Sequence, residues 1–372
     1  MRRAACVCVL ILCCSPFARA QAPVRAMVAA AYSPQLKVGD KVVGTWNTME
    51  CLIERSQGDW AWIHTEDGKE GWVRSNEVVP LDKAVDYFTQ KIAAEPGNLG
   101  WRQTRAVAYQ RQGKLDQAIA DISEAIKLAP ADLEHYYNAR GNFYLQKKDY
   151  DRALADYNQS LRLRPDNAYA WNNAGVTRRA KGDYDKAIEN LTRAISIDPA
   201  YPNAYESRAH AWADKHDYDR ALADYAKAIQ LDPKLLDAYF GRAALWETKG
   251  EFGKALADLQ KCTQIDPDEA DAHNGLAWLL ATCPDDDTRD GPRAVAEAQK
   301  ACELSAWEDL NAIDTLAAAY AEAGNFDKAV EYAQRAVEQA PEAKQAAYQK
   351  RLKLYRQKKP FRRTAESGDE NE

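Results

Sequence analysis

After its first twenty residues the sequence has no long hydrophobic run, and it carries no excess of basic residues. A membrane-spanning helix needs about 20 consecutive apolar residues, so the remainder is not expected to span a membrane. Acidic residues outnumber basic ones by 56 to 50, whereas binding to phosphates favours a surplus of lysine and arginine. We therefore expect neither a membrane span nor a nucleic-acid partner.

Cysteine is also scarce. Four of the eight cysteines lie in the first twenty residues, and the others are too few for a disulfide framework and lack the spacing of zinc or redox sites. These others are Cys51, Cys262, Cys283 and Cys302. Cys283 and Cys302 fall at opposite ends of a predicted helical hairpin, about 20 Å apart, so we expect them to remain unbridged, buried thiols.

Common catalytic motifs are absent. The five histidines show no metal-binding spacing, and there is neither a Gly-x-Ser-x-Gly turn nor a phosphate-binding glycine loop. The acidic run at 285–287 lacks the closing glutamate of a calcium loop, so we expect a solvated turn there. The sequence predicts no enzyme, no cofactor and no metal site.

The first twenty residues have the pattern of a signal peptide. Two arginines precede an apolar run over residues 4–14, and the small-x-small sequence Ala18-Arg19-Ala20 offers a cleavage site. We predict cleavage near Ala20 and export to the periplasm or the extracellular space. Residues 21–35 are predicted to be a linker.

Residues 36–80 contain short runs rich in β-branched and aromatic residues, separated by turns with glycine. This spacing predicts a small all-β barrel or sandwich. The segment resembles a bacterial Src-homology-3-like domain, through Val38-Gly39-Asp40, Gly58-Asp59-Trp60 and Gly71-Trp72-Val73. The resemblance implies an aromatic groove that binds cell-wall peptide or another protein segment.

Four tryptophans belong to this predicted barrel. We expect Trp60 and Trp72 to fill its core, because so small a barrel has few other large side chains. Trp46 and Trp62 are candidates for the groove, since an indole gives a large contact area and one hydrogen-bond donor.

From residue 82 onward one unit is repeated. Its signature is a series of prolines with gaps of 34 or 35 residues, and an alanine stands twelve residues before each of them. The prolines are Pro96, Pro130, Pro165, Pro199, Pro233 and Pro267, and the alanines are Ala84, Ala118, Ala153, Ala187, Ala221 and Ala255. Small residues in such columns let two antiparallel helices approach closely. The period and the columns resemble those of tetratricopeptide repeats.

The predicted fold class is therefore mainly α, a right-handed α-α superhelix of tetratricopeptide repeats behind a small Src-homology-3-like β barrel. The array covers 82–341, as half a repeat followed by about seven repeats. Residues 342–363 contain nine basic residues and are predicted to form a C-terminal capping helix, and 364–372 a disordered acidic tail. This combination resembles exported bacterial tetratricopeptide-repeat proteins that carry such a barrel.

The resemblance also implies a binding groove, lined by fixed positions of the first helix of each repeat. Asparagine is frequent there, and its amide pairs with the donors and acceptors of an extended peptide. The candidate groove residues are Asn138, Asn142, Asn172, Asn173, Arg179, Glu206, His210 and Phe240. Repeat proteins that clamp the C-terminal carboxylates of chaperones use three cationic positions, which hold Asn138, Asn203 and Ser207 here. That clamp is absent, because a carboxylate would have no charge partner.

Two functions fit these observations. The first is a non-catalytic exported scaffold that holds a protein or peptide in the concave groove of the array. The alternative is a cell-envelope anchor, in which the barrel binds wall peptide and the repeats act as a spacer.

Overall fold

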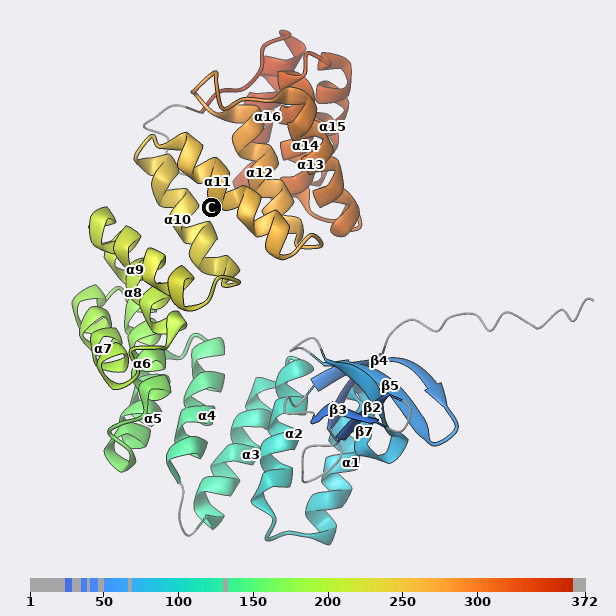
Figure 1. Cartoon of the computed structure of the whole chain (residues 1–372), viewed down its shortest axis with the longest axis vertical. Helices are drawn as coiled ribbons and strands as arrows, with labels where there is room; N and C mark the ends of the chain where they lie inside the picture. The colour runs from blue at the N-terminus through green and yellow to red at the C-terminus, as the bar shows by residue number, and fades with distance from the viewer. Residues whose placement is uncertain are drawn as a thin grey trace, which may run out of the picture. The chain divides into compact units, whose positions relative to one another are not determined.

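The computed structural model describes residues 24–28, 35–38, 41–45, 50–65, 69–129 and 133–363. They fall into two units, the first ending at Asp149 and the second beginning at Tyr150 (Figure 1). The predicted signal peptide, the predicted acidic tail 364–372 and Trp46 lie outside the described residues. Within the described part, no helix combines the length and the apolar character that crossing a membrane requires.

An antiparallel sheet opens the first unit. Its described strands follow the order β3-β2-β6-β5-β4-β1-β7, and every neighbouring pair is antiparallel. The strands are β1 (Val24–Val28), β2 (Gln35–Val38), β3 (Lys41–Thr45), β4 (Glu50–Gln57), β5 (Trp60–Thr65), β6 (Glu70–Arg74) and β7 (Val78–Pro80).

Strand β1 corrects the linker predicted for residues 21–35. It lies between β4 and β7 and pairs with both, so that Met27 stands opposite Glu50 on one side and Val79 on the other. Ala26 points into the core of the sheet, whereas Met27 packs against Phe88 of α1 (Leu81–Ala94). Strand β1 therefore forms because both of its edges pair with neighbouring strands. Its five residues are too few to show the alternation by which a strand is predicted from sequence.

The core of the sheet consists of small and aliphatic side chains. Ala61 and Ile63 of β5 are buried, whereas Trp60 and Trp62 of the same strand and Trp72 of β6 are only half-buried. The prediction that Trp60 and Trp72 fill the core is therefore wrong. Side chains alternate along a strand, and the inward positions are occupied by residues small enough for the narrow interior, so the indoles lie on the opposite face.

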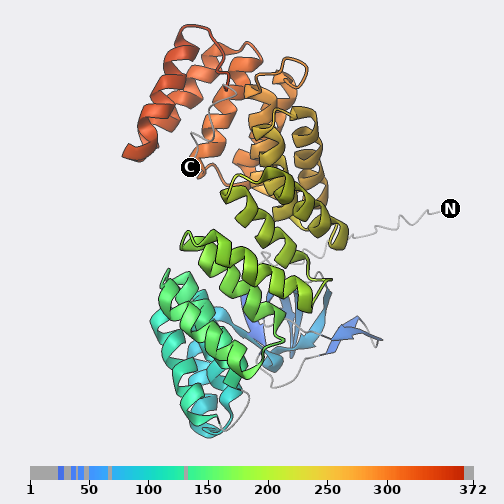
Figure 2. The same ribbon diagram turned by 90° about the vertical axis from the view of Figure 1, so that its left-hand side faces the viewer.

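Helices make up most of the rest of the chain, and within each unit every helix packs on the next one (Figure 2). The single helix α1 is followed by α2 (Leu99–Arg111), α3 (Leu115–Leu128), α4 (Leu133–Gln146), α5 (Tyr150–Leu163), α6 (Ala168–Ala180), α7 (Tyr184–Ile197), α8 (Pro202–Asp214), α9 (Tyr218–Leu231), α10 (Leu236–Thr248), α11 (Phe252–Ile265), α12 (Ala270–Thr282), α13 (Gly291–Leu304), α14 (Leu310–Glu322), α15 (Phe326–Gln339) and α16 (Glu342–Arg356). The first helices of the repeats carry even numbers, from α2 to α14.

The alanine column forms the seam between the helices of each pair. All six alanines of the column are fully buried, as are Ala294 and Ala329 of the last two pairs. On the facing helix α6, a Cβ atom added to Gly175 would lie only 2.6 Å from Cγ of Leu191 and 3.2 Å from the carbonyl oxygen of Ala187. The two helices therefore approach at a distance that only small residues permit.

A hydrogen bond recurs in the four repeats of the second unit that begin with α6, α8, α10 and α12. The fourth residue of a first helix directs its ring polar group at the carbonyl oxygen of the proline that ends the preceding repeat. The pairs are Trp171 with Pro165 (2.9 Å), Tyr205 with Pro199 (3.4 Å), Tyr239 with Pro233 (3.4 Å) and His273 with Pro267 (3.0 Å). Each ring therefore combines packing with a polar bond that ties one repeat to the next.

The predicted capping helix over 342–363 is shorter in the structure. Helix α16 ends at Arg356, and Lys358 adopts a positive φ of 56° that reverses the chain. Pro360 follows, and a proline cannot continue the helical hydrogen-bond pattern. Residues 359–363 therefore leave the helix as a segment without regular secondary structure.

Turns between paired helices allow a direct test of backbone strain. Gly113, Gly182, Gly250 and Gly324 have φ values between 72° and 80°, and Lys148 has a φ of 58° at the corresponding position. A side chain in this conformation costs about 1 kcal/mol. We expect Lys148→Gly to raise the free energy of unfolding by that amount in urea titrations followed by circular dichroism. Gly182→Ala is the reverse control and should lower it; two changes of the same sign would contradict the assignment.

Candidate binding surfaces

The predicted groove residues are divided between the two units. Asn138 and Asn142 lie half-buried on α4 of the first unit, whereas the other six lie on α6, α8 and α10 of the second. Asn172 is only 6% exposed, and its Nδ2 lies 3.5 Å from Oδ1 of the neighbouring Asn173. Asn172 is thus a packing residue in this structure, while Asn173 is half-buried beside it.

Several of the predicted residues hold the first helices to their neighbours. Arg179 of α6 forms an ion pair with Asp214 of α8, with Nε 2.5 Å from Oδ2. His210 of α8 lies between Glu206 (3.1 Å from Nε2) and the hydroxyl of Tyr225 on α9 (2.8 Å from Nδ1). These side chains are engaged in inter-helix contacts, which sequence position alone did not reveal.

Phe240 is the predicted groove residue that lines an open pocket. This pocket, of about 450 Å³, lies between the N-terminal halves of α10 and α12. It is lined by Leu236, Asp237, Phe240, Glu269, Asp271, Asn274 and Gly275. Three carboxylates around one aromatic ring suit a ligand that carries positive charge and an apolar group.

The C-terminal ends of α10, α12 and α14 carry a second surface, and it is occupied by the chain itself. The main-chain N–H of Arg363 donates to the carbonyl oxygen of Thr282 at the end of α12 (3.0 Å). The guanidinium of Arg363 pairs with Glu247 of α10, and that of Arg362 pairs with Glu322 of α14. We call residues 361–363 the C-terminal segment.

Phe361 anchors this segment over a buried ion pair. Its ring lies 5.9 Å from that of Trp278 on α12, and Cζ of Arg351 lies 5.5 Å from both rings. Arg351 of α16 is 1% exposed and pairs with Asp314 of α14, with Nη2 2.8 Å from Oδ2. Burial raises the pKa of the Asp314 carboxyl, and the Arg351 charge opposes that rise.

Sequence reasoning missed the docking of this segment. The nine basic residues after position 341 favoured a capping helix, and their charge does not reveal which acidic surface they contact. Pro360 was the available signal, because a proline ends a helix and leaves the aromatic and the two arginines after it free to extend.

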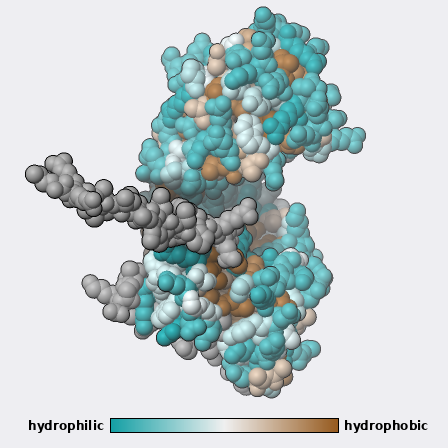
Figure 3. Space-filling view, turned by 90° about the vertical axis from the view of Figure 1, so that its right-hand side faces the viewer, coloured by the Kyte–Doolittle hydropathy of each residue, from teal (hydrophilic) through white to brown (hydrophobic). Residues whose placement is uncertain are grey.

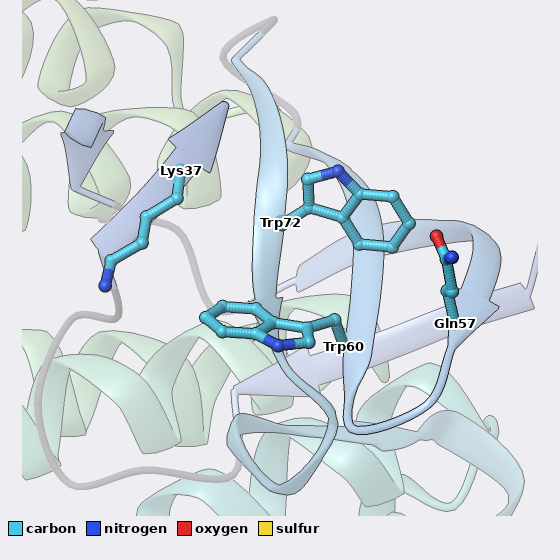
Figure 4. A pocket seen from close by; sticks show the side chains of 4 residues that line it. All are labelled: Lys37, Gln57, Trp60 and Trp72. Carbon is cyan, nitrogen blue, oxygen red and sulfur yellow. The ribbon is translucent and has the colours of Figure 1, made fainter. Parts of the chain in front are cut away.

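A third candidate surface lies on the outer face of the sheet. A pocket of about 340 Å³ is lined by Lys37, Gln57, Trp60 and Trp72, with both indole rings lying between Lys37 and Gln57 (Figure 4). The Arg74 guanidinium carbon lies 4.1 Å from the Trp60 ring centre, which keeps a second cation beside the pocket. Trp62, predicted to line a groove, packs edge-on against Trp72 at 5.4 Å.

Apolar surface is scarce on the repeats. On the face shown in Figure 3 most residues are hydrophilic, and the largest group of hydrophobic residues lies in the lower half of the view. Among the described residues the large hydrophobic side chains that are exposed are Val24, Leu52, Leu128, Leu163 and Tyr169.

The described cysteines, Cys51, Cys262, Cys283 and Cys302, lie inside the fold. All four described cysteines are buried thiols, and burial raises the pKa of Cys262 and of Cys302 to about 12. Such thiols are poor nucleophiles, because the thiolate is the reactive form. In the described part of the chain, histidines, cysteines and carboxylates do not gather in threes that could hold a metal ion.

Comparison with known proteins identifies the repeats. The tetratricopeptide-repeat family matches residues 102–132, 141–211, 208–274 and 311–343, which together span more than half of the chain. The chain is a tetratricopeptide-repeat protein. The paired helices, the buried alanines between them and the 34-residue period agree with this family.

Individual relatives share the repeats over limited lengths. Human protein O-mannosyl-transferase TMTC1 is 28% identical over 109 residues, which are 28% of this chain and 12% of that protein. Hsp70-Hsp90 organizing protein 3 of Arabidopsis thaliana is 27% identical over 85 residues, 23% of this chain and 15% of that protein. The chain thus matches less than a sixth of the length of either relative.

A solved structure shows the same fold. Yeast Tom70 superposes with a TM-score of 0.56 at 17% identity, over 74% of this chain and 58% of that one. At this identity the likeness shows the fold and nothing about a shared partner.

The buried ion pair yields a prediction for stability. Asp314→Ala leaves Arg351 charged, buried and without its partner, which costs about 3–5 kcal/mol. We expect a correspondingly lower free energy of unfolding in urea titrations. Asp219→Ala removes one partner of the solvent-exposed pair with Lys249 and should change the unfolding midpoint little. Equal effects of the two substitutions would show that the Asp314 pair does not stabilise the array.

Proposed function

We propose that this protein is an exported, non-catalytic scaffold that binds an extended protein segment on the face formed by the first helices of its second unit. The observation that carries the proposal is the C-terminal segment, a non-helical stretch of chain that contacts α10, α12 and α14 through both main chain and side chains. A surface that accommodates one such segment has the geometry to accommodate another.

The repeat family supports the same conclusion. Tetratricopeptide-repeat proteins are in general interaction scaffolds without catalytic activity, and their partners are proteins or peptides. Export rests on the first twenty residues, whose charged start, short apolar run and cleavage site fit a signal peptide. On this proposal the mature protein begins at Gln21 and works in the periplasm or outside the cell.

Site-specific photo-crosslinking tests the scaffold in the intact protein. A benzophenone side chain at Asn274 lies in the pocket between α10 and α12, whereas one at Lys261 of α11 is exposed on a second helix. We expect the Asn274 probe to form an adduct with one discrete protein and the Lys261 probe to form none, as read by gel shift and mass spectrometry. The proposal fails if both positions give the same adducts or if neither gives any.

The alternative function is an envelope anchor, and the sheet pocket favours it. Trp60 and Trp72 offer stacking surfaces, while Lys37 and Arg74 place positive charge beside them. Such a pocket suits a peptide that carries a free carboxylate, as cell-wall peptides do. The resemblance of residues 36–80 to Src-homology-3-like domains points to the same ligand class.

Co-sedimentation with purified cell wall measures how much of the protein the wall retains, and so tests this alternative. If the sheet is the anchor, Trp60→Ala should weaken retention of the full mature chain about tenfold, because the ring forms one wall of the pocket. Phe240→Ala, in the pocket of the array, is the matched aromatic control and should leave retention unchanged. Equal retention of the wild type and both variants would exclude the sheet pocket as the wall-binding site.

A further inference from the structure

We propose that the surface at the C-terminal ends of α10, α12 and α14 recognises an extended basic segment of a partner protein, an aromatic residue followed by two arginines, and that the C-terminal segment of this chain occupies that surface as an intramolecular competitor. The inference rests on the proposed scaffold function and adds the chemistry of the partner. It follows from what Phe361, Arg362 and Arg363 contact.

The surface is electronegative for two independent reasons. Glu247 and Glu322 provide carboxylates, and both are largely shielded from solvent. The helix ends add main-chain carbonyl groups, since Ala281 accepts from Arg362 (3.4 Å) and Thr282 from Arg363. The C-terminus of a helix carries partial negative charge, so cations are favoured there.

At the position of Arg362, arginine fits this surface better than lysine does. Glu322 is shared by Arg362 and Arg289, whose Nε lies 3.1 Å from the second carboxylate oxygen. Arg362 bonds to a carboxylate and to a carbonyl oxygen at once, which takes several donors in one plane. The guanidinium group offers such a fork, whereas an ammonium group is a single point of charge.

The aromatic position is defined by Trp278 and Arg351. Phe361 lies against the Trp278 ring, and the Arg351 guanidinium approaches both rings. An aromatic side chain is favoured here over an aliphatic one, because its ring face attracts the cation. The site thus binds three consecutive residues. It contacts the ring of the first, Phe361 here, and pairs with the charges of the next two, Arg362 and Arg363.

The segment can leave without unfolding the array. Gln357, Lys358 and Lys359, which join it to α16, are exposed. Helix α16 itself is anchored by Tyr348, Leu352 and Tyr355, which are buried in the core of the last repeats. A partner therefore competes against three docked residues and not against the fold.

A partner can also use contacts that the C-terminal segment does not make. The carboxylates of Asp237, Glu269 and Asp271 line the pocket at the other ends of α10 and α12. Asp237 and Glu247 are ten residues apart on α10, which corresponds to about 15 Å along the helix, or four to five extended residues. The residues after Arg363 include four acids and no base, so they do not suit this pocket. A partner with a further basic residue at that spacing gains the additional contact.

Peptide binding to the full mature chain tests the proposal. The probe is a fluorescent peptide, Lys-Pro-Phe-Arg-Arg-Thr, that copies residues 359–364, and the readout is fluorescence anisotropy. The variant R362A/R363A removes both charges of the C-terminal segment and leaves the residues that line the surface unchanged; we call it the emptied variant, because Phe361 alone then remains to occupy the site. Because a tethered segment acts at roughly millimolar effective concentration, we expect the variant to bind the peptide about tenfold more tightly than the wild type. Added salt should weaken this binding, since the contacts are ionic.

Matched variants separate the site from general charge effects. K358A/K359A removes the same charge from the exposed connection and should leave the affinity at the wild-type value. E322Q added to the R362A/R363A variant should abolish its gain of about tenfold in peptide affinity. Thermal unfolding followed by circular dichroism verifies that each variant is folded. In the wild type, excess peptide should speed tryptic cleavage after Arg362, because the displaced segment becomes accessible.

Two results would overturn the proposal. If the emptied variant does not bind the peptide, the surface does not recognise this sequence. If wild type and emptied variant bind equally, the C-terminal segment is no competitor. Either failure leaves the scaffold itself standing if the Asn274 probe still captures a discrete partner, whereas loss of that adduct as well would remove both proposals.

Discussion

The close approach of paired helices at fully buried alanines is the constraint on which the rest of the structure depends. Because Ala187, Ala221 and Ala255 leave no space at the seam, larger side chains must occupy other positions of each repeat. In α6, α8, α10 and α12 the fourth position takes a tyrosine, tryptophan or histidine that also bonds to the preceding proline. Repeating this unit sets the first helices in register, and the C-terminal ends of α10, α12 and α14 form one row of carbonyls and carboxylates.

That row explains how a basic segment docks without an apolar groove. Glu247 and Glu322 lie at equivalent ends of α10 and α14, and α12 between them offers main-chain carbonyls. The buried pair of Asp314 and Arg351 keeps α16 against α14 and presents Arg351 to the ring of Phe361. Arg351 therefore takes part both in the packing of the last repeats, through Asp314, and in the docking of the C-terminal segment, through Phe361.

The repeat array was predictable from the sequence because its period and its alanine column are local and recur. Three features were not. Strand β1 is fixed by pairing on both edges, and the indoles of Trp60 and Trp72 face outward because Ala61 and Ile63 fill the inner positions. The contact of Arg363 with Glu247 joins residues 116 positions apart, and no local pattern specifies it. Phe240 was predicted as a groove residue and lines a pocket, whereas Asn172 is buried by neighbouring side chains.

The central claim is that the first helices of the second unit hold an extended basic segment. A crystal structure of the mature R362A/R363A variant with the six-residue peptide bound tests it most directly. The account predicts that the two peptide arginines lie against Glu247 and Glu322, with the phenylalanine ring beside Trp278. A peptide bound on the second helices or on the sheet pocket would contradict it.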